Sequence, residues 1–364
     1  MIAALARAFD RFRGSGDAAV TIPSMDGAFR PNVGLETATS ILELSAPDNL
    51  TYDGRRVLLS SGCKLLELKG RPPTTAEAIA EYAHPITALD AHVNGTIAVG
   101  LASGEIVLVG GNTLNPRLNS VGDRPSRCPT ALRFLDADTL IVCLGSQHND
   151  PTGWARDLLE NNSSGSIWSV DLRNGNARCL ADRLAWPSGV VTSKRSHTVV
   201  VEAWRHQLVQ IADDRRHSLL TEIPGYPGRI SPAGNGGYWL SVFAPRSQLL
   251  EFVLREPGFR GRMMREVESQ FWVAPSLHAA RDYREPLQAG AIKQLGELKP
   301  WAPSRSYGLV VHLDEDFQAV RSFHSRADGK RHGITSCVEA EGRVLVTSKG
   351  GDVVLALRLE ESRG

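Results

Sequence analysis

Short apolar runs separated by polar turn residues recur six times along the chain. In the clearest copy, mostly apolar runs cover residues 186–191, 199–202 and 208–211, and polar residues separate them. Runs of this length are typical of antiparallel strands. One small sheet cannot bury both of its faces, but sheets stacked radially around an axis can. The pattern therefore predicts an all-β fold, a six-bladed β-propeller.

The six predicted units have three strands each. Glycine follows Asp53 and Asn94 in the turns between the first and second strands, where positive φ angles are needed. In chain order the runs cover 50–52, 57–60 and 64–68; 86–89, 96–99 and 105–109; 131–134, 139–143 and 166–170; 186–191, 199–202 and 208–211; 228–231, 238–242 and 307–313; and 334–338, 344–347 and 353–357. We expect one propeller domain over residues 21–360.

The first 20 residues predict an N-terminal amphipathic helix. Ile2, Leu5 and Phe9 follow helical spacing, and Arg7 and Arg11 lie between and beside them. Such a helix could pack on the propeller or make a weak contact with a membrane surface or a partner. We find no secretory h-region and no run long enough to span a bilayer. The sequence therefore predicts a cytoplasmic protein without stable membrane insertion.

Two long insertions interrupt the third and fifth units at the same point, between the second and third strands. They cover about residues 145–165 and 244–305. Loops at this point of each unit share one face of a propeller, so both insertions should form lids over one mouth of the channel. Long insertions confined to one face usually carry function. The alternatives are a dimer contact, which leaves a homo-oligomer open, and protection of a sheet edge.

Charge and cysteine usage restrict the partners. Lysine plus arginine and aspartate plus glutamate nearly balance, with a formal net charge of +1, and no basic stripe suits a phosphate backbone. We expect no nucleic acid, and a small molecule as the partner. The five cysteines lack CxxC spacing, which favours small reduced core residues over zinc ligands or a disulfide framework.

An ordered series of motifs resembles the strictosidine synthase-like branch of the six-bladed propellers, whose superfamily includes gluconolactonases and paraoxonases. The resemblance covers about residues 20–360 and implies the same propeller fold. The motifs are APDNL at 46–50, GSIW at 165–168, LAWPSGV at 184–190, VEAWRH at 201–206, PGYP at 224–227 and YGLV at 307–310.

The resemblance also implies what to expect of a metal. Calcium-dependent lactonases of the superfamily hold the ion at the channel mouth with an acid in unit one, an Asn in unit four and an acid in unit five. This chain keeps Asp48 but has Ser188 and Gly228 at the other two positions, followed by Arg229. Calcium prefers six to eight oxygen ligands, and a guanidinium repels it. No cofactor is therefore favoured, although calcium stays open.

Strictosidine synthase itself uses a Glu near the start of its last unit as an acid/base. The matching position here is near Thr335. The sequence therefore does not predict condensation of an amine with an aldehyde.

The ends of the inner strands supply candidates for acyl chemistry. A carboxylate can accept a proton from water, a histidine can carry it, and a cation can stabilise an oxyanion. No Gly-x-Ser-x-Gly motif nominates a serine nucleophile, which favours attack by water. The catalytic candidates are Asp48, Glu202, His148 and His332, and the substrate-binding candidates are Asn49, His84, Gln147, Trp154, Trp204, Arg229, Thr335 and Lys349.

The leading candidates also have structural alternatives. Glu202 could form an ion pair with Arg205 or Arg229, and Asp48 could cap a turn. The histidines could be solvated or hold a loop, and the tryptophans could be packing residues. A carboxylate desolvated under the lid would have a raised pKa, which suits proton transfer near neutral pH.

The sequence therefore favours a hydrolase of a lactone or ester-like, partly apolar small molecule. Alternatives are a non-enzymatic small-molecule-binding propeller and a lyase or isomerase that uses the same acid/base residues. A perturbed carboxylate beside a histidine in a closed pocket would favour an enzyme. A mouth filled by ion pairs and aromatic packing would favour binding.

Overall fold

The computed structural model describes residues 22–71, 73–111, 116–213, 215–281, 284–285, 292–294, 297–299 and 305–358. The N-terminal helix predicted for residues 1–20 lies outside the described residues. No helix in the described part of the chain is both long and apolar enough to cross a membrane.

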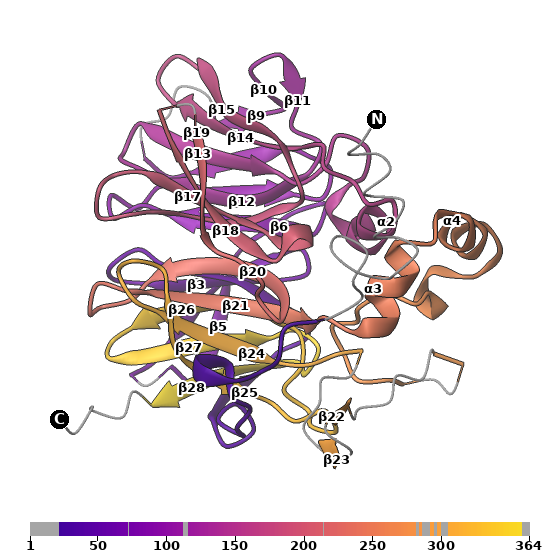
Figure 1. The fold of residues 1–364 in the computed structure, drawn as a ribbon. Helices are drawn as coiled ribbons and strands as arrows, with labels where there is room; N and C mark the ends of the chain where they lie inside the picture. Colours follow the sequence, from indigo (N-terminus) through magenta and orange to yellow (C-terminus); the bar gives the residue numbers. More distant parts are fainter. Residues whose placement is uncertain are drawn as a thin grey trace.

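Six antiparallel four-stranded sheets form the blades of a propeller, as the sequence predicts (Figure 1). Their strands, from the innermost outward, are β2 (Pro47–Tyr52), β3 (Val57–Ser61), β4 (Lys64–Lys69), β5 (Thr75–Glu81); β6 (Ile86–Ala91), β7 (Ile97–Leu101), β8 (Ile106–Val109), β9 (Arg117–Leu118); β12 (Pro129–Phe134), β13 (Thr139–Leu144), β14 (Gly165–Asp171), β15 (Ala177–Leu184); β16 (Pro187–Thr192), β17 (Thr198–Glu202), β18 (Gln207–Ala212), β19 (Arg215–Leu220); β20 (Gly225–Pro232), β21 (Tyr238–Pro245), β24 (Leu309–Leu313), β25 (Ala319–His324); and β26 (Ile334–Ala340), β27 (Arg343–Ser348), β28 (Val353–Arg358), β1 (Thr39–Glu43).

The innermost strands surround the central channel. Each inner strand contacts the next one, in the order β2, β6, β12, β16, β20 and β26. The last of them, β26, contacts β2 and so closes the circle. Side chains at the starts of these strands therefore meet at one end of the channel, and side chains at their ends meet at the other.

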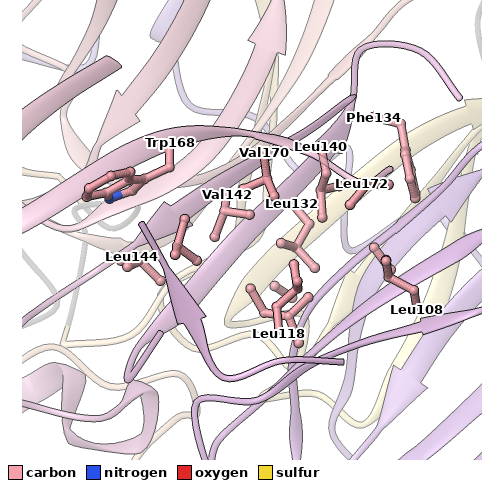
Figure 2. Close-up of a cluster of buried hydrophobic side chains, with 14 residues drawn as sticks. Leu108, Leu118, Leu132, Phe134, Leu140, Val142, Leu144, Trp168, Val170 and Leu172 are labelled. Atoms are coloured by element: carbon pink, nitrogen blue, oxygen red, sulfur yellow. The ribbon is translucent and has the colours of Figure 1, made fainter. Parts of the chain in front are cut away.

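The hydrophobic core lies between neighbouring blades. In β13 the run from Leu140 to Leu144 is buried on both faces, because one face packs on blade two and the other on blade four. Figure 2 shows the first of these clusters, in which Leu140 and Val142 of blade three and Leu108 and Leu118 of blade two belong to one group of buried side chains. Burial on both faces explains the continuous apolar runs in the sequence.

The fourth, outermost strand of each blade is the element that the sequence pattern misses. In β5, for example, every residue is partly or fully exposed, so the strand lacks a buried apolar face. The N-terminal strand β1 supplies the outermost strand of blade six. It pairs antiparallel with β28, with Thr39 opposite Ala356 and Glu43 opposite Val353, and so joins the first described strand to the last.

The two insertions pack against each other on one side of the propeller (Figure 1). The first contains η3 (Pro151–Gly153) and α2 (Trp154–Leu159), and its Leu159 carbonyl accepts a hydrogen bond from Arg260 in the second. This placement confirms the prediction that both insertions lie on one face. The second contains α3 (Gln248–Leu254), α4 (Pro257–Glu266), η5 (Ser269–Phe271), β22 (Ile292–Gln294) and β23 (Glu297–Lys299); elements outside both are η2 (Gly27–Phe29), η4 (Ala203–Arg205), β10 (Ser120–Val121) and β11 (Arg124–Pro125).

Candidate functional site

A cavity of about 360 Å³ lies at the end of the channel that the insertions cover. Inner strands supply most of the polar lining, Lys349 follows the end of β27, and the insertions supply residues that include Trp154 and Leu277. We call this cavity the mouth pocket. Its described lining residues are Asp48, Pro85, Ile86, Thr87, Thr130, Pro151, Thr152, Trp154, Trp186, Ser188, Gly228, Arg229, Phe243, Leu277, Thr335 and Lys349.

Asp48 is a buried carboxylate held between two cations. Its Oδ1 lies 2.9 Å from Nη1 of Arg229, and its Oδ2 lies 2.9 Å from Nζ of Lys349. The Asn49 backbone N–H also donates to Oδ1, at 2.7 Å. Burial acts to raise the pKa of Asp48, but the charges of Arg229 and Lys349 outweigh it and lower the pKa to about 2. The raised pKa expected from the sequence is therefore wrong for Asp48.

Arg229 crosses the channel from β20 and joins the inner strands of three other blades. Besides its ion pair with Asp48 in β2, it donates to the carbonyl of Thr87 in β6 at 2.7 Å and to that of Thr335 in β26 at 3.3 Å. The preceding Gly228 leaves no space for a side chain, because a Cβ there would lie 2.7 Å from Oγ of Ser241.

These residues do not fit a calcium ion. Both carboxylate oxygens of Asp48 already bind cations, and Ser188 uses its hydroxyl to donate to the Pro227 carbonyl at 2.9 Å. Across the described residues, no group of three or more His, Cys, Asp or Glu side chains could hold a metal. Calcium needs several oxygens, usually including more than one carboxylate. The permanent charge of Arg229 lies beside Asp48, the single carboxylate in the described lining of the mouth pocket.

Five of the residues predicted from the sequence line the mouth pocket together. Asp48, Arg229 and Lys349 form its charged floor, with Thr335 beside them and Trp154 in its wall. Asn49 lies next to Asp48 but does not line the pocket; its Nδ2 donates instead to Ser60 Oγ at 2.8 Å.

Glu202 does not line the mouth pocket. It ends β17, where its Oε1 accepts hydrogen bonds from the Ala185 backbone N–H at 2.8 Å and from Arg205 at 2.9 Å. Its Oε2 accepts from Gln207 at 2.6 Å. Both oxygens therefore bind neighbouring residues of the protein, as in the structural alternative. This geometry gives Glu202 no access to a ligand in the mouth pocket.

No histidine among the described residues lines the mouth pocket. His332 is buried, with Nδ1 2.7 Å from Ser306 Oγ and Nε2 2.8 Å from the Arg326 carbonyl, and burial lowers its pKa. His84, His148 and the neighbouring candidate Gln147 are exposed outside the pocket. The expected pairing of a mouth carboxylate with a histidine is absent from this part of the chain.

An aromatic cluster forms the wall beside the charged floor. Trp204, a predicted binding residue, lies behind this wall and stacks on Trp186 with ring centroids 5.1 Å apart. Trp154 meets Phe243 edge-on at 5.7 Å. Sequence reasoning missed Trp186 and Phe243 as lining residues. The Trp-Pro pair before a glycine signalled a turn at Trp186, whose φ is 56°.

Asp157 is the other residue that sequence reasoning missed. Its carboxylate is buried in α2 and accepts hydrogen bonds from Trp204 Nε1 at 2.9 Å, Asn149 at 3.0 Å and Asn162 at 2.9 Å. These bonds fasten the first insertion to the aromatic wall. A lone acid in a polar loop gives no signal of this role in the sequence.

Comparisons with known proteins support the resemblance to strictosidine synthase-like proteins. The adipocyte plasma membrane-associated protein of Danio rerio is 23% identical over 329 residues, which cover 83% of this chain and 73% of the relative. Strictosidine synthase-like 10 of Arabidopsis thaliana is 26% identical over 113 residues, about 30% of either chain. No family model matches.

Solved structures with the same fold include lactonases and a calcium-binding protein. A gluconolactonase from Xanthomonas campestris is 12% identical with a TM-score of 0.52, and the match covers 88% of this chain and 89% of that one. Regucalcin from Agrobacterium tumefaciens, described as calcium-binding, is 11% identical with a TM-score of 0.54, covering 88% and 93%. Identities this low establish the propeller fold and leave the chemistry to the site itself.

Proposed function

We propose that this relative of strictosidine synthase-like proteins hydrolyses a lactone or ester-like, partly apolar small molecule in the mouth pocket. The observation that carries the proposal is a lysine–aspartate–arginine group at the floor of a pocket with aromatic walls. Gluconolactonases share the fold, which is consistent with this chemistry. The low identity means that substrate and mechanism rest on the pocket alone.

Lys349 is the residue placed to stabilise a developing oxyanion. Its ammonium has three donors, one of which binds Asp48, and the side chain is 33% exposed. Arg229, by contrast, uses its guanidinium to hold Asp48 and two backbone carbonyls. We therefore assign oxyanion stabilisation to Lys349 and the positioning of Asp48 to Arg229.

The proposed reaction is the addition of water to the substrate carbonyl. The water oxygen forms a bond to the carbonyl carbon, and the resulting oxyanion interacts with Lys349. Asp48 accepts the proton of the water and passes it to the leaving oxygen as the ester bond breaks. A pKa of about 2 makes Asp48 a weak base, so the reaction also needs charge stabilisation by Lys349.

A non-enzymatic binding propeller is the second candidate. The ion pairs of Asp48 and the absence of a histidine from the described lining favour it, because a proton-transfer site usually has groups with pKa values near the working pH. In that case Lys349 and the aromatic wall would hold a small anion with an apolar part.

Location and metal independence are further parts of the proposal. All five cysteines are free thiols, which supports a reducing compartment such as the cytoplasm. Relatives named for the plasma membrane make a membrane-associated location the alternative. The misfit of the pocket to calcium supports activity without a bound ion.

A panel of lactones and esters tests the function. We expect the parent protein to hydrolyse members of the panel with and without a chelator, and Lys349→Met to lose about 10²–10³-fold in kcat. Lys194→Met is the matched control, because Lys194 pairs with Glu315 away from the mouth pocket. If the parent binds members of the panel but hydrolyses none, the binding function replaces the hydrolase.

A further inference from the structure

A second cavity, of about 740 Å³, lies between the two insertions and adjoins the mouth pocket. Thr152 and Trp154 of the first insertion and Leu277 of the second line both cavities. We call the second cavity the outer groove. We call these three shared residues the junction. Through the junction, one continuous path leads from the charged floor of the mouth pocket to the outer groove.

The outer groove has an apolar wall with a basic edge. Phe271, Trp272 and Ala274 supply apolar surface, and Arg156 and Arg281 lie at the exposed edge. The apolar wall suits an apolar chain, because the free energy falls when water leaves apolar surface.

Hydrogen bonds hold the apolar wall in place. Arg305 donates to the Ala274 carbonyl at 2.9 Å and to Glu285 at 2.8 Å. Trp272 donates through Nε1 to the Val267 carbonyl at 2.8 Å. These part-buried hydrogen bonds therefore hold the wall in place.

The junction is fixed by two glycines of blade six. A Cβ at either Gly333 or Gly350 would overlap the carbonyl oxygen of Leu277. The loop that carries Leu277 therefore rests directly on the backbone of blade six. Because Gly350 follows Lys349, this contact sets the position of the junction relative to the charged floor.

We propose that the two cavities form one binding site for an elongated ligand. Its head, a carbonyl or carboxylate, lies at Lys349 in the mouth pocket. Its apolar arm passes the junction at Thr152, Trp154 and Leu277 and lies in the outer groove. The inference rests on the proposed function for the head group, and it adds a long unbranched apolar arm to the substrate class.

Straight-chain carboxylates from butanoate to dodecanoate test the arm by isothermal titration calorimetry, without any turnover. Burial of each added methylene should raise the affinity roughly fourfold, until the arm fills the outer groove. An affinity that does not change with chain length, or no binding by any member of the series, would overturn the inference.

A variant that blocks the junction separates the groove from non-specific binding. Thr152 is exposed in η3, so Thr152→Trp should fill the junction without disturbing the core. We expect its affinity for the carboxylate series to lose the dependence on chain length. Phe259→Ala, at an exposed position of α4 outside both cavities, should behave as the parent. An unchanged dependence in Thr152→Trp would contradict the inference.

The two proposals fail in different ways. If the affinity rises with chain length but no lactone or ester is hydrolysed, the elongated binding site is supported and the hydrolase function is contradicted. If short lactones are hydrolysed but the affinity does not depend on chain length, the hydrolase function is supported and the binding of an apolar arm in the outer groove is contradicted.

Discussion

Each end of the channel carries a buried aspartate, and the pKa values of the two carboxyl groups are shifted in opposite directions. At the covered end, Asp48 contacts two cations at 2.9 Å, and its pKa falls to about 2. At the other end, Asp90 accepts from Thr51 at 3.0 Å and the Phe134 backbone N–H at 2.7 Å, while the nearest cation, Arg133, is 3.7 Å away. Burial dominates there and raises the pKa of Asp90.

Burial alone therefore does not determine the charge state of a propeller carboxylate. Asp48 and Asp90 are 6% and 4% exposed, so they are almost equally desolvated. The difference lies in the number and distance of cations around each. Arg229 lines both the mouth pocket and a cavity of about 320 Å³ at the Asp90 end, so its side chain lies between the two.

The largest expected effect is on turnover. Asp48→Asn should lower kcat by about 10²–10⁴-fold, because it removes the only carboxylate that the described lining of the mouth pocket contains. Asp90→Asn should leave kcat unchanged, because Asp90 lies at the other end of the channel. Steady-state kinetics on a lactone that the parent hydrolyses makes the comparison. Equal losses in the two variants would contradict a single site at the covered end.

Removal of the guanidinium between the two ends should cost stability. Arg229→Met leaves Asp48 with one cation and removes one donor each from the carbonyls of Thr87 and Thr335, so we expect a loss of about 3–5 kcal/mol in the free energy of unfolding. Arg133→Met should cost less than about 1 kcal/mol, because that ion pair is long and a third of the Arg133 side chain is exposed. Denaturant unfolding measures the loss of unfolding free energy in both variants. Similar losses would show that the contacts of Arg229 between blades contribute no more to stability than the ion pair of Arg133.

Acid titration should separate the two aspartates by sign. The lowered pKa of Asp48 stabilises the fold above pH 4, and about 2–3 kcal/mol is lost as the pH falls from about 4 to about 2. The raised pKa of Asp90 has the opposite effect: its contribution is complete below pH 4 and is lost as the pH rises through the folded-state pKa.

Unfolding free energies measured across this pH range check both contributions. In Asp48→Asn, the unfolding free energy should fall less at acid pH than it does in the parent. In Asp90→Asn, the decrease in unfolding free energy above pH 4 should disappear. The same curve for both variants would mean that the surrounding charges do not distinguish them.

The smallest effect is expected at Glu202. Glu202→Gln should keep the turnover of the parent, because the side chain lies outside the mouth pocket. It should lower the unfolding free energy by about 1 kcal/mol, since its bonds to Ala185, Arg205 and Gln207 weaken. Kinetics and melting on one preparation decide the matter, and a large loss of turnover with unchanged stability would restore Glu202 as a catalytic residue.

The propeller was predictable because its strands are buried on both faces. Continuous apolar runs such as that of β13 mark the inner three strands of each blade. The outermost strands were not predictable, because β5 and β19 face solvent and carry a polar pattern that resembles a loop. Their pairing depends on the neighbouring strand more than on their own sequence.

The candidate site was predictable only where position along the chain decides which side chains meet in the mouth pocket. Asp48 and Thr335 lie at strand starts, Arg229 lies in the middle of an inner strand, and Lys349 follows a strand end, so propeller geometry brings them together. The assignment of Glu202 as a catalytic residue ignored side-chain direction, and only the structure shows its bonds to Ala185, Arg205 and Gln207. The histidines looked suitable by type, yet His332 is buried among polar partners elsewhere and His148 is exposed.

The pairing of β1 with β28 has a consequence for biosynthesis. The ribosome makes β1 before any blade exists, but its partner β28 is made only after the strands of the other five blades. Until then β1 has an unpaired edge, and the circle of blades stays open. Ring closure must therefore wait until β28 has been made, because only then can the first and the last strand of the described propeller pair.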